Sequence, residues 1–185
     1  MGLILTDGQG TGKTLGIDSD NRARVNSVSQ STEHFINHIK GVAYNLLFSA
    51  TPSATDDCFL YFKNESETDI VIEGFWLHLE ANEYIDIYLD QTGTPIGGSD
   101  ITPVNLNSGS GKSAEGTFQN GNDITGITGG VKPFRIHHAS SQGSTYRNFN
   151  QDIVLTKNGV FTMYCETGTT ALDGIIVFNY HNPND

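Results

Sequence analysis

The sequence has little that would mark a disulfide-stabilised or membrane-spanning protein. Only two of its 185 residues are cysteines, Cys58 and Cys165, and both lie inside apolar strand-like runs. We therefore expect reduced thiols buried in a core rather than a disulfide. No apolar stretch approaches the ~20 residues that span a membrane. The apolar run at residues 1–5 ends at Thr6, so we expect no secretory signal and a soluble chain made in a cytosol.

Basic residues are also scarce. Ten Lys and Arg stand against 21 Asp and Glu, which gives a formal net charge of −11. Residues 1–40 hold equal numbers of acidic and basic side chains, so residues 41–185 carry the whole excess. Phosphate backbones are bound by clustered Lys and Arg, and residues 41–185 contain no such cluster. The composition predicts no nucleic-acid partner.

Long helical blocks are missing as well, and short apolar runs between Gly, Pro, Asn and Ser turns recur from residue 41. Eight or nine short strands in this range are typical of a sandwich or barrel. The lack of βαβ alternation argues against a parallel nucleotide-binding sheet. We predict an all-β protein: a jelly-roll-like antiparallel β-sandwich at residues 41–185. The expected strands cover residues 42–49, 57–63, 70–80, 84–90, 101–106, 133–138, 152–156, 160–165 and 172–180.

Residues 1–40 predict an extended N-terminal arm with a possible short helix at residues 31–40. Gly and polar residues dominate the beginning of the arm, and such a segment buries too little apolar surface to become ordered alone. Residues 8–14 resemble a phosphate-binding loop, but Asp7 occupies the position of the first glycine that this motif requires. We predict that the arm orders against a partner instead.

The clearest period-two pattern lies in residues 75–89. It places Phe75, Leu77, Leu79, Ile85, Ile87 and Leu89 on an inner face, and Trp76, His78, Asp86 and Tyr88 on an outer face. A three-residue loop at residues 81–83 predicts a hairpin that pairs residue 78 with 86 and residue 76 with 88. We interpret the four outer residues as a self-association or ligand face. Residues 73–74 interrupt the alternation and predict a β-bulge.

Residues 93–130 contain ten of the 21 glycines. This stretch is too long for an ordinary connection between strands. Two interpretations stay open: a set of excursions with short ladders, or a functional loop.

No catalytic or metal-binding constellation is recognisable. His34 and His38 have the spacing of ligands on a helix, but the metalloprotease motif is incomplete. Asp86 and Asp90 would lie about 13 Å apart along a strand, which exceeds the spacing of glycosidase carboxylates. We predict no catalytic residue, no metal site, no cofactor and no enzymatic activity.

Four segments of the sequence are distinctive: LTDGQGTGK at residues 5–13, NRARV at 21–25, LYFKN at 60–64 and DIVI at 69–72. In these segments the chain resembles a group of tailed-bacteriophage virion proteins. The resemblance implies a structural component of the virion, made in the host cytoplasm, such as a capsid decoration protein. Its partner would be the major capsid protein or another virion protein, and a homo-oligomer, most simply a trimer, would suit repeated shell sites.

On this hypothesis the arm attaches the protein to the shell, whereas Trp76, His78, Asp86 and Tyr88 support self-association. The attachment residues would be Leu3, Leu5, Lys13, Leu15, Ile17, Arg22, Arg24, Val25 and Val28. An alternative is a carbohydrate- or receptor-binding module of a phage tail or fibre, with Trp76, Tyr88 and the loops at 93–130 as its site. A further alternative is a cupin-like enzyme, which would need a His and carboxylate metal cluster.

Overall fold

A computed structural model describes residues 16–17, 23–24, 35–139, 143–168 and 170–181. The chain forms two compact units, Met1–Thr32 and Glu33–Asp185. In the first unit, the described residues form the short antiparallel strands β1 (Gly16–Ile17) and β2 (Ala23–Arg24). Ile17 and Arg24 of the predicted attachment set lie in these strands. The other members lie outside the described residues: Leu3, Leu5, Lys13, Leu15, Arg22, Val25 and Val28.

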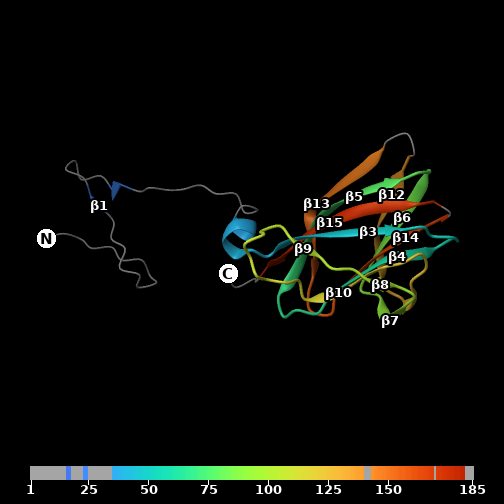
Figure 1. Cartoon of the computed structure of the whole chain (residues 1–185), viewed down its shortest axis with the longest axis horizontal. Helices are drawn as coiled ribbons and strands as arrows, with labels where there is room; N and C mark the ends of the chain where they lie inside the picture. The colour runs from blue at the N-terminus through green and yellow to red at the C-terminus, as the bar shows by residue number, and fades with distance from the viewer. Residues whose placement is uncertain (1–15, 18–22, 25–34, 140–142, 169, 182–185) are drawn as a thin grey trace. The chain divides into compact units, whose positions relative to one another are not determined.

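The second unit is an antiparallel β-sandwich that follows a short π-type helix, η1 (Phe35–Lys40). One sheet contains, in order, β13 (Ser144–Leu155), β5 (Asp69–Leu79), β15 (Leu172–His181), β3 (Ala43–Ala50) and β9 (Val104–Asn105). The other contains β12 (Val131–His138), β6 (Glu83–Leu89), β14 (Val160–Cys165), β4 (Asp57–Asn64), β10 (Gly116–Asn120) and β8 (Ser99–Asp100). Figure 1 shows β5, β15 and β3 side by side. The all-β sandwich is confirmed, and its jelly-roll winding stays a prediction.

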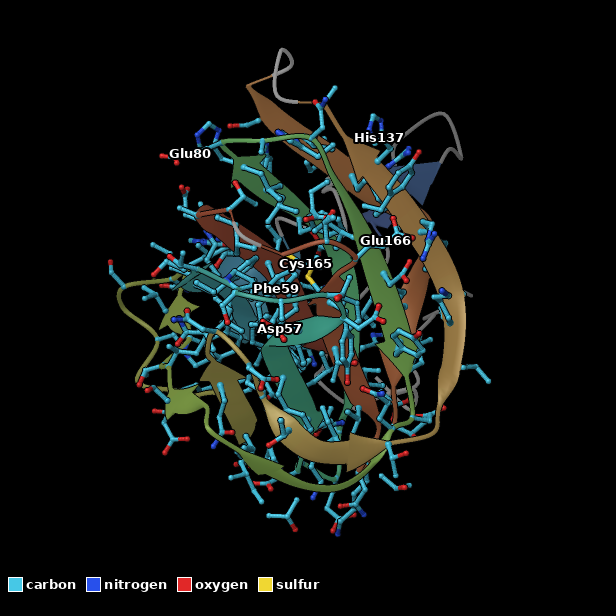
Figure 2. The ribbon with its side chains drawn as sticks, turned by 90° about the vertical axis from the view of Figure 1, so that its right-hand side faces the viewer. Asp57, Phe59, Glu80, His137, Cys165 and Glu166 are labelled. Atoms are coloured by element: carbon cyan, nitrogen blue, oxygen red, sulfur yellow. The ribbon has the colours of Figure 1, made fainter. Side chains whose placement is uncertain are left out.

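Apolar side chains from both sheets form one core between the layers. The predicted inner residues Phe75, Leu77, Leu79, Ile85 and Ile87 are at most 1% exposed. In Figure 2, Phe59 and Cys165 lie in the interior, whereas Glu80 and His137 lie toward the periphery. The period-two pattern therefore predicted correctly which side of β5 and β6 faces the core.

The predicted hairpin of β5 and β6 is wrong, because the two strands belong to different sheets. β5 pairs with β13 and β15, and β6 pairs with β12 and β14. The same alternation of apolar and polar residues is expected for two strands paired in a hairpin and for two strands joined by a corner that crosses from one sheet to the other. The local pattern therefore did not distinguish these two arrangements. At this corner the buried Glu83 carboxylate accepts hydrogen bonds from Thr167 N, Thr167 Oγ1 and Gly168 N at 2.7–3.0 Å. These bonds tie the start of β6 to the end of β14.

The β-bulge predicted at residues 73–74 is present in β5. Along β15, Val177 pairs with Gly74 but the next residue, Phe178, pairs with Ile72, so Glu73 is the extra residue. The ladder with β13 is interrupted at the same place. A side chain at Gly74 would collide with the Arg147 carbonyl, which explains the glycine beside the bulge.

The strands predicted from apolar runs are present, and the ends of most differ by no more than two residues. The exceptions are 101–106, where only Val104–Asn105 forms a strand, and 152–156, which is the end of the longer strand β13. The predicted strand 160–165 coincides with β14. The strands that were not predicted, β7 (Thr92–Ile96), β8, β10, β11 (Thr125–Thr128) and the first half of β13, are rich in Gly, Thr, Ser or Asn. Their residues are mostly half-buried or exposed, so they lack the apolar signal on which the strand prediction depends.

The Gly-rich region folds over the outer face of the six-stranded sheet. β7 and β11 pair as a two-stranded ribbon, and β10 extends the sheet itself beside β4. Ile124 and Ile127 pack in a small second cluster with Cys58, Tyr61 and Val160. Of the two interpretations of residues 93–130, the structure shows the first: excursions that form short two-stranded ladders.

The ribbon is held by close backbone approach and by one buried amide. A side chain at Gly93, where φ is +115°, would collide with the Gly126 carbonyl. Gln91 Oε1 accepts hydrogen bonds from Thr162 Oγ1 at 2.6 Å and from Tyr164 OH at 3.0 Å. The start of the ribbon is thereby fastened to β14.

Both cysteines are free and buried, as predicted, but they occupy different layers. Cys58 belongs to the cluster under the ribbon, and Cys165 belongs to the core of the sandwich. Burial raises the pKa of each thiol to about 12. Because the two thiols are similarly unreactive when covered, their labelling rates report how each layer opens.

We predict that a thiol reagent modifies Cys58 before Cys165 under native conditions, because only the ribbon must open to uncover Cys58. Ile124→Ser removes apolar contact from the cluster beneath the ribbon, and it should speed Cys58 labelling about tenfold or more without changing Cys165. Peptide mass spectrometry distinguishes the two sites. Equal labelling rates for both cysteines would contradict a separately opening ribbon.

Candidate functional site

The outer face of the five-stranded sheet carries a row of apolar side chains. In the strand register, Tyr146 lies opposite Trp76, Trp76 opposite Ile175, and Ile175 opposite Leu47. Tyr146, Trp76 and Leu47 are 50%, 43% and 56% exposed. We call these four residues the apolar row. A cluster of exposed apolar side chains marks a surface that binds a ligand or another protein.

Trp76 and Tyr146 form a stacked pair within this row. Their ring centroids are 4.3 Å apart and the ring planes differ by 25°. Stacking orients the indole, because each ring limits the rotamers of the other. The row therefore presents an oriented aromatic platform.

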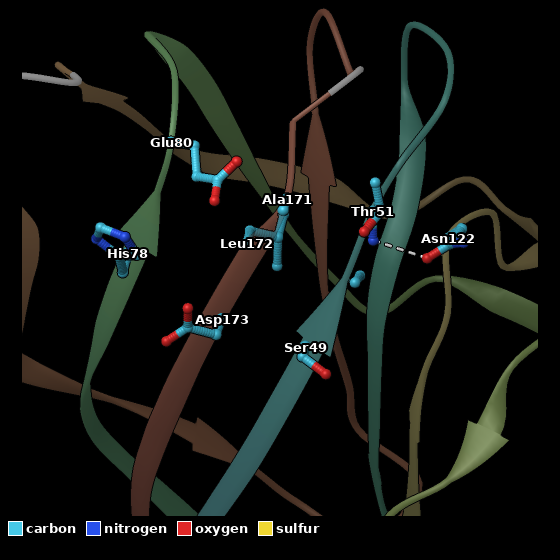
Figure 3. A pocket seen from close by; sticks show the side chains of 9 residues that line it. Ser49, Thr51, His78, Glu80, Asn122, Ala171, Leu172 and Asp173 are labelled. Carbon is cyan, nitrogen blue, oxygen red and sulfur yellow. Dashed lines mark hydrogen bonds between the residues drawn. The ribbon is translucent and has the colours of Figure 1, made fainter.

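A polar pocket adjoins the apolar row. Two residues further along each strand, on the same face, His78 lies opposite Asp173 and Asp173 lies opposite Ser49. These residues border an open pocket of about 480 Å³ (Figure 3). Its lining is Ser49, Ala50, Thr51, His78, Glu80, Asn122, Ala171, Leu172 and Asp173.

Hydrogen bonds position one wall of the pocket and leave its acids free. Thr51 N donates to Asn122 Oδ1 at 2.7 Å, the bond drawn in Figure 3. His78 Nδ1 lies 3.3 Å from the Gly143 carbonyl oxygen. Among the described residues, no hydrogen bond or ion pair engages the carboxylates of Glu80 and Asp173. Both carboxylates are therefore available as acceptors.

The pocket is suited to hydrogen bonding rather than to metal binding. In the part of the chain that the structure describes, no three His, Cys, Asp or Glu side chains are grouped to hold a metal ion. Lys and Arg are absent from the residues that line the pocket. The arrangement presents carboxylates, hydroxyls, an amide and an imidazole beside an aromatic pair.

The structure brings together only half of the predicted outer face. Trp76 and His78 lie at this site, whereas Asp86 and Tyr88 lie on the other sheet. The predicted pairing of His78 with Asp86 is wrong because it depended on the hairpin. Tyr88 packs instead against Tyr164, with ring centroids 5.1 Å apart.

Sequence analysis missed Tyr146, Asp173 and Asn122 as site residues. Tyr146 lies in the polar half of β13, where no alternation marked a strand. Asp173 and Asn122 come from β15 and from the turn between β10 and β11. The pairing of β5 with β13 and β15 brings Tyr146 and Asp173 to the face of Trp76 and His78, and Asn122 reaches the pocket through its hydrogen bond with Thr51 N. No local signal encodes these long-range contacts.

Asp86 has a structural role at the other sheet. Its nearly buried carboxylate contacts Arg135 through Nε at 2.7 Å and Nη2 at 2.8 Å, and Lys132 Nζ at 2.9 Å. Arg135 also contacts Glu166 at 2.7 Å. Hydrogen bonding from Arg135, supported by Lys132, holds the pKa of Asp86 below its ordinary value. This cluster clamps edge strand β12 onto β6.

Comparison with known proteins assigns no family, since no protein-family model, curated protein or solved structure matches the chain. Among the described residues, no helix is both long and apolar enough to cross a bilayer.

We predict that Trp76, the sole tryptophan, is partly accessible to acrylamide in the folded protein. Tyr146→Ala uncovers a second ring face and should raise the Stern–Volmer quenching constant. Tyr84→Ala, which removes a similarly exposed tyrosine from the other sheet, is the control and should leave quenching unchanged. Equal quenching in the wild type and the Tyr146 variant would contradict the stack.

We predict that Asp86→Asn lowers the free energy of unfolding at neutral pH by about 2 kcal/mol, because charge-assisted bonds to Arg135 and Lys132 are lost. A carboxyl with a lowered pKa stabilises the fold above its unfolded pKa of about 3.9, and this stabilisation disappears as pH falls through the folded pKa. The gap between variant and wild type should therefore close in acid. Denaturant titrations across that pH range, with Asp90→Asn as control, measure it. A gap independent of pH would contradict the assignment.

Proposed function

We propose that the chain is a structural protein of a tailed-phage virion, a capsid decoration protein that attaches through its N-terminal segment and acts by binding alone. The observation that carries this proposal is the division of the chain into Met1–Thr32 and Glu33–Asp185. The described apolar core is supplied entirely by residues between Val42 and Tyr180. We therefore assign the core to the second unit and propose attachment as the role of the first.

Charge supports the same arrangement. The first 40 residues are neutral overall, whereas residues 41–185 carry the net charge of −11. A neutral segment approaches another protein surface without the repulsion that the acidic sandwich would meet from a similar one. The proposed partner is the major capsid protein or another virion protein, and the proposed assembly is a trimer at symmetric shell sites.

The resemblance of residues 5–13 and 21–25 to virion proteins is the basis for placing the partner in a phage particle. Both segments belong to the first unit. The proposal therefore assigns attachment to two of the four segments that carry the similarity; the other two, residues 60–64 and 69–72, lie in the sandwich. The sandwich is then the displayed part, and the outer face of its five-stranded sheet is a surface for further contacts.

We predict that deleting residues 1–32 abolishes binding to phage heads and leaves the sandwich folded, because the described core contains no residue from this segment. Co-sedimentation with heads stripped of the protein measures binding. Far-UV circular dichroism and Trp76 emission measure the fold. A truncated chain that still decorates heads at full occupancy would contradict attachment through this segment, and absence of the full-length chain from purified virions would contradict the virion role.

A further inference from the structure

We propose that the pocket and the Trp76–Tyr146 pair form a binding site for a neutral saccharide, either one pyranose ring or the end of a short glycan. A pyranose has an apolar face of C–H groups and a rim of hydroxyls. The site offers a matching pair of surfaces: a stacked aromatic platform and, beside it, a pocket lined with polar side chains.

The aromatic platform and the pocket are close enough to engage one ligand. Trp76 and His78 are two residues apart on the same face of β5, and Ile175 and Asp173 are two residues apart on the same face of β15. Two residues along a strand span about 7 Å, which is close to the width of one sugar ring. A ring lying on Trp76 therefore directs hydroxyls into the pocket.

The polar lining supplies every kind of hydrogen-bonding partner that a hydroxyl rim requires. The free carboxylates of Glu80 and Asp173 accept hydrogen bonds, and charged acceptors form the stronger ones. The Asn122 amide is held through its oxygen by Thr51 N, which leaves its NH₂ group as a donor. The Ser49 hydroxyl donates and accepts. In Figure 3 Glu80, His78 and Asp173 gather on one side of the opening, and Thr51 and Asn122 on the other.

Charge narrows the class of ligand. The pocket lining contains two carboxylates that are unpaired among the described residues, and it contains neither Lys nor Arg, so it repels phosphates, sulfates and acidic sugars. The same two carboxylates disfavour a second copy of the chain that would place its own acidic lining on this face. A neutral polyol meets no such repulsion and uses acceptors and donors together.

The volume is consistent with a small saccharide. About 480 Å³ lies within the usual range for small-molecule sites. The pocket is open along one side, so a ring can enter while the rest of a glycan stays in solvent. The inference does not depend on attachment through residues 1–32, so either proposal can fail without the other.

The test uses the full chain and its sole tryptophan as the reporter. Methyl glycosides of glucose, galactose, mannose and N-acetylglucosamine are titrated while Trp76 emission is recorded, and saturation-transfer NMR records ligand contact. At least one glycoside should give a saturable change, with a dissociation constant on the order of 1 mM for a single ring. The same glycoside should show transfer to its ring C–H groups.

Matched variants locate the site. Tyr146→Ala and Asp173→Asn should each weaken binding about tenfold or more, because one loses the platform and the other a charged acceptor. Tyr84→Ala and Asp90→Asn make the same chemical changes elsewhere and should leave binding unchanged. Circular dichroism verifies that all four variants are folded.

Three outcomes would overturn the proposal. The first is no change in emission or saturation transfer with any glycoside at tens of millimolar. The second is a change in Trp76 emission that follows protein concentration instead of sugar, which would identify the face as a contact between copies. The third is binding of a Lys- and Arg-rich peptide at Asp173 without binding of any sugar, which would identify a basic protein partner.

Discussion

The period-two alternation of β5 is the constraint on which both the core and the candidate site depend. Successive side chains of this strand point to opposite faces, so Phe75 and Leu77 enter the core only if Trp76 and His78 leave it. The Glu73 bulge resets this alternation along the strand, and downstream of it β5 pairs Trp76 with Tyr146 on one side and Ile175 on the other. A slip of one residue would bury Trp76 and dismantle the platform together with the core.

The outer faces of the two sheets differ in how far other parts of the chain cover them. Over β4 and β14 the six-stranded sheet is covered by the Gly-rich ribbon: Ile124 packs on Cys58, and Gln91 at the start of the ribbon is bonded to Thr162. Within the described residues, no comparable layer covers the apolar row on the five-stranded sheet. The cover comes from the segment that follows β6, whereas the corner before β6, held by the buried Glu83 carboxylate, sends β5 into the other sheet.

Sequence reasoning reached the features that depend on neighbouring residues and missed those that depend on distant ones. It predicted the all-β class, the buried faces of β5 and β6, the bulge at Glu73 and the reduced thiols, since each is encoded by alternation, by glycine or by an apolar run. It predicted the wrong partner strands for β5 and β6, because a hairpin and a connection that crosses between sheets have the same sequence pattern. The site followed the same rule: Trp76 was identified from its outward position, whereas Tyr146 and Asp173 reach it only through pairings across more than 65 residues. Asp86, chosen as a surface residue, proved to be a nearly buried ion-pair partner of Arg135.

The sandwich presents an aromatic platform beside an acidic, hydrogen-bonding pocket. We propose that this face is a ligand site. The most direct measurement is a crystal structure of the full chain with a bound methyl glycoside. The account predicts a sugar ring lying on Trp76, with hydroxyls within hydrogen-bond distance of Asp173 and Glu80. A sugar bound elsewhere, or a Trp76 face covered by residues 1–32 or by another copy of the chain, would contradict it.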